Sequence, residues 1–223
     1  FSTIFTVDVQ AYGTTTITVS GISAATNVFV IHPEVVSVVP TSGTVGTIVT
    51  VAGTGYAAND AVTVAFGINT NIQTTTASQY GSFSTTFTVD TQSFGTTTIT
   101  SSGVNVATNM FVILPELYSV LPPSGTVGTI VTISGTGYAA NDDITVAFGT
   151  NASIKTAVAS QHGSFTTSFT VDTQAYGTTT ITAGGVSVVA GNVFNILPAV
   201  VSVVPTSGTV GTIVTVAGTG YAA

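Results

Sequence analysis

Short runs of alternating apolar and polar residues follow one another along the whole chain. "AVTVAFG" places Val62, Val64 and Phe66 on one side of an extended segment, and "TIVTVAG" does the same with Val49 and Val51. A period of two is the spacing of a half-buried β-strand, and the dominant Thr, Val, Ile and Phe suit a pleated surface. Because no segment shows the helical spacing of apolar residues, the pattern predicts an all-β protein.

The same alternation predicts which other side chains form the core. In "SFSTTFTVD", "GTTTIT" and "NMFVILP" the inward positions are Phe83, Phe87, Val89, Ile99, Phe111 and Ile113. Turn-forming segments lie between the runs: "PTSG", "GTGYAAND", "GINTN", "SQYG", "TQSFG" and "SSG". Gly adopts positive φ there, and Asn, Asp and Ser bond to nearby backbone. About seven short strands per repeat, separated by such turns, predict an immunoglobulin-like β-sandwich.

The chain repeats itself. "FTVDVQAYGTTTIT" begins at Phe5, and its copies begin at Phe87 and Phe169, 82 residues apart each time. This period exceeds the roughly 20–45 residues of solenoid repeats and is long enough for an independently folded domain. We therefore expect tandem domains: the C-terminal half of one repeat at 1–36, complete repeats at 37–118 and 119–201, and the N-terminal part of another at 202–223.

The partial repeats at the two ends allow two interpretations. In the first, the sequence is a window within a longer repetitive chain. In the second, the tail of one chain completes the half-domain of the next by strand exchange. The two ends together lack the counterpart of residues 59–82, so the composite domain would miss central strands, and the sequence favours the first interpretation.

One stretch resembles a known family. "PTSGTVGTIVTVAGTGY" (from Pro40), followed by "VTVAFG", is similar to the IPT/TIG-type immunoglobulin-like repeats of prokaryotic surface proteins, and "GSFSTTFTVD" with "GTTTIT" matches the second half of that repeat. The resemblance implies tandem sandwiches that serve as stalks, spacers or assembly modules outside the cell. It implies no particular ligand.

Charge is nearly absent. Only 4% of the 223 residues are charged, with eight carboxylates, one lysine (Lys155) and a net charge of −7. A typical soluble domain is about a quarter charged. A chain with one cation lacks the main attraction for a phosphate backbone, so we expect no nucleic-acid partner. No apolar run reaches the roughly 20 residues that span a bilayer, so we expect no membrane insertion in this segment.

The low charge suggests what covers the surface. Monomeric sandwiches usually protect their sheet edges with lysine, inward-pointing charges or bulges. Here the solvent-side positions are Thr and Ser, which lose water at lower cost than charged groups. We expect these faces to contact other copies, so that the protein forms a non-enzymatic extracellular filament or cell-surface layer through self-association. The alternative is the stalk of a surface adhesin whose Thr runs carry O-linked sugar.

Catalytic and metal-binding patterns are weak. A nucleophile, a base and an orienting acid could be drawn by residue type from Ser160, His162 and Asp172. However, neither His162 nor the other histidine, His32, is retained between repeats. We therefore predict no catalytic residues and no cofactor. The recurring Asp8, Asp90 and Asp172 are expected to bond to backbone N–H groups. With the "YAAND" residues (Asn59, Asp60, Asn141, Asp142 and Asp143) they offer oxygen ligands for Ca²⁺, but too few carboxylates converge to predict a metal site.

Three further features concern glycosylation, crosslinking and sugar binding. "NAS" at Asn151 is an N-glycosylation acceptor pattern, although the sister repeat has "NTN". An isopeptide crosslink would require a lysine in each repeat, and Lys155 is the only one. A carbohydrate-binding accessory module would require exposed aromatics, for which Tyr12 and Tyr176 are the candidates.

Overall fold

The described part of the chain, residues 2–185 and 189–221 of a computed structural model, contains β-strands and connecting turns without a helix. It divides into two compact units. Unit 1 comprises Phe1–Asp90 and Gly95–Ile113, and unit 2 comprises Thr91–Phe94 and Leu114–Ala223. Each unit is described by itself below. The prediction of an all-β protein built from tandem immunoglobulin-like sandwiches is confirmed.

Among the described residues, ten strands belong to each unit. Those of unit 1 are β1 (Gly13–Ser20), β2 (Ala24–Ile31), β3 (Glu34–Val39), β4 (Ser42–Gly43), β5 (Ile48–Thr54), β6 (Ala61–Phe66), β7 (Asn69–Thr76), β8 (Phe83–Thr88), β9 (Gly95–Ser102) and β10 (Val106–Ile113). Those of unit 2 are β11 (Glu116–Leu121), β12 (Ser124–Gly125), β13 (Ile130–Thr136), β14 (Asp143–Phe148), β15 (Asn151–Val158), β16 (Phe165–Thr170), β17 (Gly177–Gly184), β18 (Val189–Ile196), β19 (Ala199–Val204) and β20 (Thr215–Thr219).

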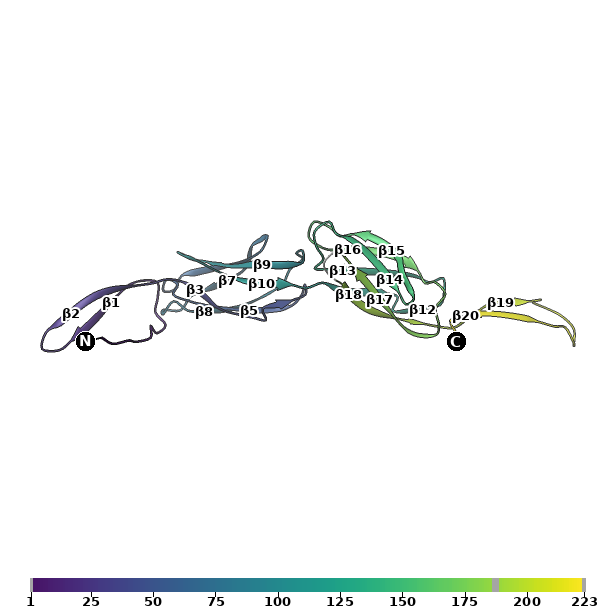
Figure 1. Ribbon diagram of the computed structural model, residues 1–223, viewed down its shortest axis with the longest axis horizontal. Coiled ribbons are helices and arrows are strands. Elements are labelled where there is room, and N and C mark those ends of the chain that lie inside the picture. The colour runs from purple at the N-terminus through teal and green to yellow at the C-terminus, as the bar shows by residue number, and fades with distance from the viewer. Residues whose placement is uncertain (1, 186–188, 222–223) are drawn as a thin grey trace. The chain divides into compact units, whose positions relative to one another are not determined.

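Two sheets form the sandwich of unit 1. One has the order β3-β5-β8, and the other has the order β4-β10-β9-β6-β7 (Figure 1). All neighbours pair antiparallel except β4, which runs parallel to β10. A three-stranded sheet facing a sheet built around three central antiparallel strands, with an additional edge strand on it, is an immunoglobulin-type arrangement.

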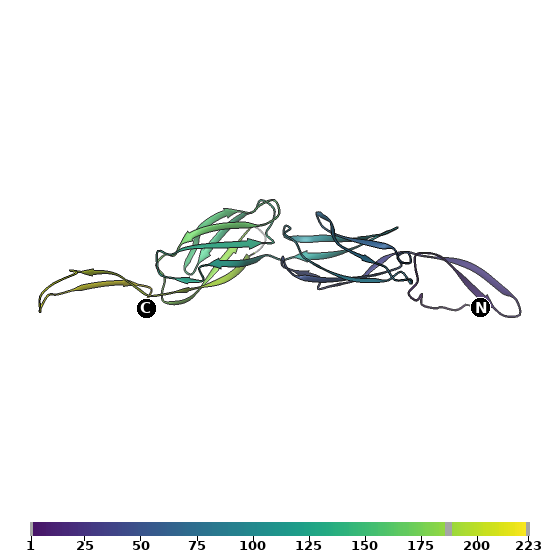
Figure 2. The same cartoon turned by 180° about the vertical axis from the view of Figure 1, so that it is seen from behind.

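Unit 2 repeats this arrangement strand for strand. Its sheets have the orders β11-β13-β16 and β12-β18-β17-β14-β15. Figure 2 shows the strands from behind. Both units interrupt the first strand pair at the same place, with register shifts between Val35 and Ser37 and between Leu117 and Ser119. Each unit also contains a two-stranded hairpin, β1-β2 in unit 1 and β19-β20 in unit 2.

The core lies between the two sheets and includes the residues that the alternation predicted, together with Val35, Val38, Tyr56 and Ala77, which it did not. In unit 1, Val49, Val51, Val62, Val64, Phe66, Ile99, Phe111 and Ile113 are fully buried, and Phe83, Phe87 and Val89 are nearly so. Aromatic rings contact one another inside it: the ring centroids of Phe66 and Phe111 lie 5.6 Å apart, edge to face. Edge-to-face contacts add to the gain from burial alone, and the same pair recurs in unit 2 as Phe148 and Phe194.

Several predicted turn segments extend into strands, as "PTSG" does into β4 and "SSG" does into β9, and the prediction for "GINTN" is wrong. "GINTN" was expected to be a turn, but only Gly67 and Ile68 form it, and Asn69 begins β7. The strand "NTNIQTTT" lies at the outer edge of the larger sheet, where a strand needs few apolar side chains. Its polar composition therefore gave no periodic signal, although it spans eight residues.

Candidate functional site

The few charged side chains are confined to particular places. Glu34, Glu116 and Asp143 are the first residues of β3, β11 and β14. The remaining carboxylates, those of Asp8, Asp60, Asp90, Asp142 and Asp172, lie outside the strands. In the part of the chain that the structure describes, Lys155 is the only charged residue in the middle of a strand. The broad faces of both sandwiches are therefore almost free of charge.

The outward side of the larger sheet in unit 1, here called the outer face, shows this most clearly. Its side chains alternate with the buried ones and come from β10 (Val106, Thr108, Met110, Val112), β9 (Thr96, Thr98, Thr100, Ser102), β6 (Ala61, Thr63, Ala65) and β7 (Thr74, Thr76). None of them is charged. Met110 is 65% exposed and Val106 is 60% exposed, so this uncharged face presents apolar side chains to its surroundings.

Unit 2 has a corresponding outer face. β18 contributes Val189, 66% exposed, and Val193, 54% exposed, at the positions of Val106 and Met110. Asn195 replaces Val112, and Asp143 at the beginning of β14 is the single charge. The nearly uncharged, threonine-rich character of the surface therefore recurs from one repeat to the next.

Hydroxyl groups on the smaller sheet of unit 2 satisfy one another. The Thr132 and Ser168 hydroxyl oxygens lie 2.8 Å apart, and those of Ser134 and Thr166 lie 2.9 Å apart. Both pairs join neighbouring strands, β13 and β16. A hydroxyl that already has a protein partner loses little when water is removed, because the cost of burial arises mainly from unpaired polar groups.

The recurring aspartates bind side-chain amides. Asn151 Nδ2 donates to Asp172 Oδ2 at 2.8 Å, and Gln174 Nε2 donates to Asp172 Oδ1 at 2.9 Å. In unit 1, Asn69 Nδ2 donates to Asp90 Oδ2 at 3.0 Å. The side-chain oxygen of each asparagine accepts from the backbone N–H two residues later. Asn69 makes the same contacts as Asn151 although its sequence, "NTN", is not an N-glycosylation pattern. The asparagine at this position therefore has a structural role in both repeats, and glycosylation of Asn151 stays a prediction.

The "YAAND" turns use their polar residues for backbone geometry. Asn59 and Asn141 have positive φ values of 58° and 57°, a conformation that asparagine tolerates better than most residues. Asp60 Oδ2 accepts from the Val104 N–H at 2.7 Å and so fixes the β9–β10 turn. Among the described residues, no group of three or more His, Cys, Asp or Glu side chains is placed to hold a metal ion.

The residues of the hypothetical catalytic set have other partners. Ser160 Oγ accepts from the backbone N–H of His162 and of Ser164, each at 3.2 Å, which is the geometry of a turn. The His162 ring is exposed and lies 3.5 Å from the Gln161 amide. Asp172 is occupied by the two amides described above. The three residues therefore do not form a nucleophile, base and acid relay.

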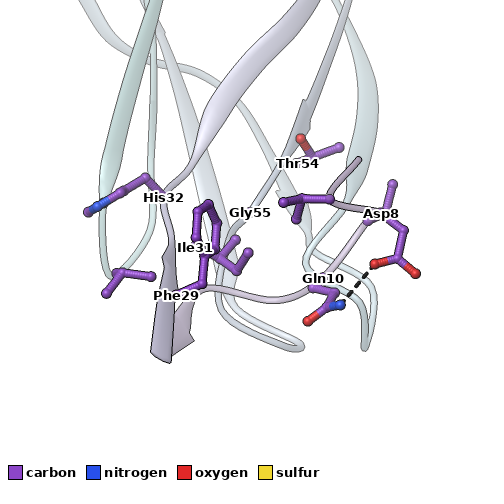
Figure 3. A pocket seen from close by; sticks show the side chains of 10 residues that line it. Asp8, Gln10, Phe29, Ile31, His32, Thr54 and Gly55 are labelled. Atoms are coloured by element: carbon purple, nitrogen blue, oxygen red, sulfur yellow. Dashed lines mark hydrogen bonds between the residues drawn. The ribbon is translucent and has the colours of Figure 1, made fainter. Parts of the chain in front are cut away.

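A hollow of about 320 Å³ lies in unit 1 beside β2 (Figure 3). Phe29 lines it, and the counterpart of Phe29 in the next repeat, Phe111, is a fully buried core residue. Gln10 Nε2 donates to Asp8 Oδ1 at 2.8 Å, and the exposed His32 lies on the opposite side of the hollow. A ligand site needs polar groups that converge on the ligand. Here the hollow is lined by a residue of core type, Phe29, and the polar Gln10 and Asp8 bond to each other, so the hollow does not have the features of a ligand site.

A backbone contact recurs beside the tyrosines that end the "GTGY" segments. The Tyr12 N–H donates to the Tyr56 carbonyl at 2.7 Å, and the Phe94 N–H donates to the Tyr138 carbonyl at 2.9 Å. Tyr176 makes the corresponding bond to the Tyr221 carbonyl at 3.3 Å. The candidate sugar-binding residues Tyr12 and Tyr176 thus recur at a position whose backbone is held, while their side chains are 37% and 57% exposed.

The phenol groups of Tyr56 and Tyr138 lie in the core. Tyr138 Oη donates to the Ala183 carbonyl at 3.1 Å, and Tyr56 Oη bonds to Ser101 Oγ. Burial raises the pKa of Tyr138 to about 12 and also raises the pKa of Tyr56. Both phenols therefore remain neutral in the folded units at physiological pH.

In the described part of the chain, no helix is long and apolar enough to span a membrane.

Comparison with known proteins gives a fold likeness only. No protein-family model matches the sequence, and no curated protein matches it. Solved structures with a similar arrangement include a biofilm-associated protein BSP domain (18% identity, covering 70% of this chain and 28% of that one, TM-score 0.27). The Yersinia pseudotuberculosis adhesin InvE is another (15% identity, covering 74% of this chain and 58% of that one, TM-score 0.32). A third is invasin, a bacterial integrin-binding protein (15% identity, covering 78% of this chain and 43% of that one, TM-score 0.33).

The chain thus spans less than two thirds of the length of each of these proteins.

Proposed function

We propose that this chain is a non-enzymatic structural region of an extracellular filament or cell-surface layer, in which sandwich repeats associate with other copies through their uncharged outer faces. The observation that carries the proposal is the outer face of unit 1, where exposed Met110 and Val106 lie among threonines with no charged side chain. The sequence resemblance to IPT/TIG-type repeats of prokaryotic surface proteins supports the same location and role.

The size of one outer face predicts weak individual contacts. The four strands that form the outer face lie about 4.8 Å apart, and at about eight residues each with a rise of 3.3 Å they cover roughly 500 Å². Stable interfaces bury about 800 Å² on each partner, so one face is below that size. Two repeats of one chain that each engage a partner would exceed it, and linked contacts strengthen each other through effective concentration. Tandem repetition is therefore what makes the proposed association stable.

The alternative function is the stalk or spacer of a surface adhesin. Exposed threonines such as Thr96 and Thr98 on β9 favour it, because O-linked sugar on them would solubilise an uncharged face by bulk. A carbohydrate-binding accessory module is the least favoured, since it rests only on the exposed Tyr12 and Tyr176.

Sedimentation velocity across a concentration series tests the proposal, together with electron microscopy and the intact mass of the native protein. We expect concentration-dependent association, which Met110→Lys weakens. Tyr80→Lys is the matched control, because Tyr80 is similarly exposed at 60% but lies in a turn between β7 and β8. A protein that stays monomeric at high concentration and carries no sugar would contradict the proposal, and a heavy, heterogeneous mass would favour the stalk.

A further inference from the structure

We propose that Gln73 in unit 1 and Lys155 in unit 2 guard the edge of the larger sheet, where each prevents the backbone of a second copy from adding as a further strand. The observation is that one Gln73 side chain occupies backbone groups of two neighbouring edge strands, and that the only cation of the chain stands at the same position of the next repeat.

The edge of the larger sheet in unit 1 is suited to strand addition. β7 is the last strand of its sheet, spans eight residues and contains neither a charge nor a proline. Its exposed residues are mostly threonines, which have a high preference for strands. A long, uncharged edge with free N–H and C=O groups is a template for pairing with another chain, and natural proteins usually block such edges.

Gln73 makes two hydrogen bonds at this edge. Its Nε2 donates to the Thr86 carbonyl on β8 at 2.8 Å, and its Oε1 accepts from the Thr74 N–H at 3.0 Å. β8 is the edge strand of the other sheet. The Gln73 side chain therefore closes the side of the sandwich and uses an acceptor of one edge strand and a donor of the other.

The Thr74 N–H is on the free side of β7. Thr74 pairs with Thr63 on β6, whereas its neighbour Gln73 pairs with the buried Val64. In an antiparallel ladder, successive residues of an edge strand direct their N–H and C=O groups alternately toward the neighbour and away from it. The N–H that Gln73 binds is thus one that an added strand would require.

In unit 2 the same position carries a charge. Lys155 pairs with the buried Val146 on β14, as Gln73 pairs with Val64, and it is exposed. Lysine on an edge strand disfavours addition of another strand because pairing would remove the ammonium from water. Every other charged residue of the chain lies at the beginning of a strand or outside the strands, so Lys155 occupies the one strand-interior position where a charge blocks an edge.

This inference concerns the sheet edges and goes beyond the proposed association through the faces. If the proposed function is correct, the guards direct contacts to the outer faces and exclude side-by-side merging of sheets. If the wild-type chain proves monomeric, the guards still act, because they concern what happens when they are removed. The two proposals can therefore fail separately.

The test compares valine and exchange variants of the full chain. Gln73→Val removes both hydrogen bonds and keeps a good strand former, and Lys155→Val removes the charge. Gln73→Lys and Lys155→Gln exchange the residues that the two repeats already use, so both are compatible with the fold. Thr75→Val is the matched control, because Thr75 lies on the same strand, is half-buried and pairs with the buried Val62.

We expect Gln73→Val and Lys155→Val to form thioflavin-positive or sedimenting β-assemblies at a concentration on the order of tenfold lower than wild type, because edge backbone groups become available to a partner strand. Gln73→Lys, Lys155→Gln and Thr75→Val are expected to match wild type. Circular dichroism and thermal melting establish that each variant is folded.

Folded valine variants that remain as dispersed as wild type would overturn the inference. It would also be overturned if Thr75→Val assembled equally, or if Gln73→Val assembled only in proportion to a loss of thermal stability, because the residue would then stabilise the fold without guarding its edge. Assembly restricted to the valine variants at unchanged melting temperature would support it.

Discussion

Gly163 is expected to be one of the least replaceable residues of unit 2. Its φ is +72°, and a Cβ placed on it would lie 2.0 Å from the Tyr138 carbonyl oxygen and 2.9 Å from Ser93 Cα. That same oxygen accepts the Phe94 N–H. Gly163→Ala therefore adds backbone strain and also displaces a carbonyl that is already hydrogen-bonded.

The two costs can be separated with a matched glycine. Gly128 has a φ of +93° and nothing within 4 Å of a Cβ built on it. Gly128→Ala is expected to cost about 1–2 kcal/mol from positive φ alone. Gly163→Ala is expected to cost a further ~1–3 kcal/mol, the usual range when a core must move to admit extra atoms.

Amide hydrogen exchange on the 223-residue chain measures this difference within unit 2. The strongly protected amides of β13 and β14 should lose roughly 5- to 140-fold more protection in Gly163→Ala than in Gly128→Ala, which is the same free-energy difference expressed as an equilibrium constant. The Phe94 amide should exchange faster still. Equal losses in the two variants would refute the reasoning, since the close approach to the Tyr138 carbonyl would then impose no constraint.

Three further predictions follow from the buried and recurring polar groups. Burial raises the pKa of Tyr138 in the folded unit to about 12, above the ordinary tyrosine value of 10.0, so its stabilising contribution is complete below about pH 10 and is lost as the pH rises through 12. Denaturant titrations at several alkaline pH values should show this loss of stability, and Tyr138→Phe should diminish it. Asp172→Ala should destabilise unit 2 by about 1–3 kcal/mol in denaturant unfolding, because two amides lose their acceptor, whereas Thr173→Ala on the exposed neighbouring position should have little effect. A calcium chelator should leave the melting temperature and any association unchanged, and a lowered melting temperature would revive the Ca²⁺ interpretation of the "YAAND" turns.

Most of the core could be predicted from the sequence, although the fully buried Tyr56 lies in a segment that was predicted only as a turn. Val62, Val64 and Phe66 alternate with polar residues, and all three are fully buried, because a strand between solvent and core has one apolar side. The turns were predicted for a similar reason, since Gly and Asn supply the positive φ that Asn59 and Gly55 adopt.

The partners of the polar residues could not be predicted in the same way. Asp172 was expected to bond to backbone N–H groups and instead binds Asn151 and Gln174. Ser160, His162 and Asp172 are residue types that a catalytic relay could use. In the structure, however, Ser160 accepts the backbone N–H of His162, and Asp172 accepts from the Asn151 amide. Hydrogen bonding depends on three-dimensional position, which residue type and spacing do not determine for a turn.

The edge strand β7 shows which features the sequence determines and which only the tertiary structure determines. By itself the sequence determined the strand class, the inward side chains, the repeat and the shortage of charge, because each is a property of composition or of local period. Only the tertiary structure decided that "NTNIQTTT" is β7, that it lies at a sheet edge, and that Gln73 binds Thr86 across the sandwich. An edge strand is defined by the neighbour it lacks, and that is a property of the assembled sheet.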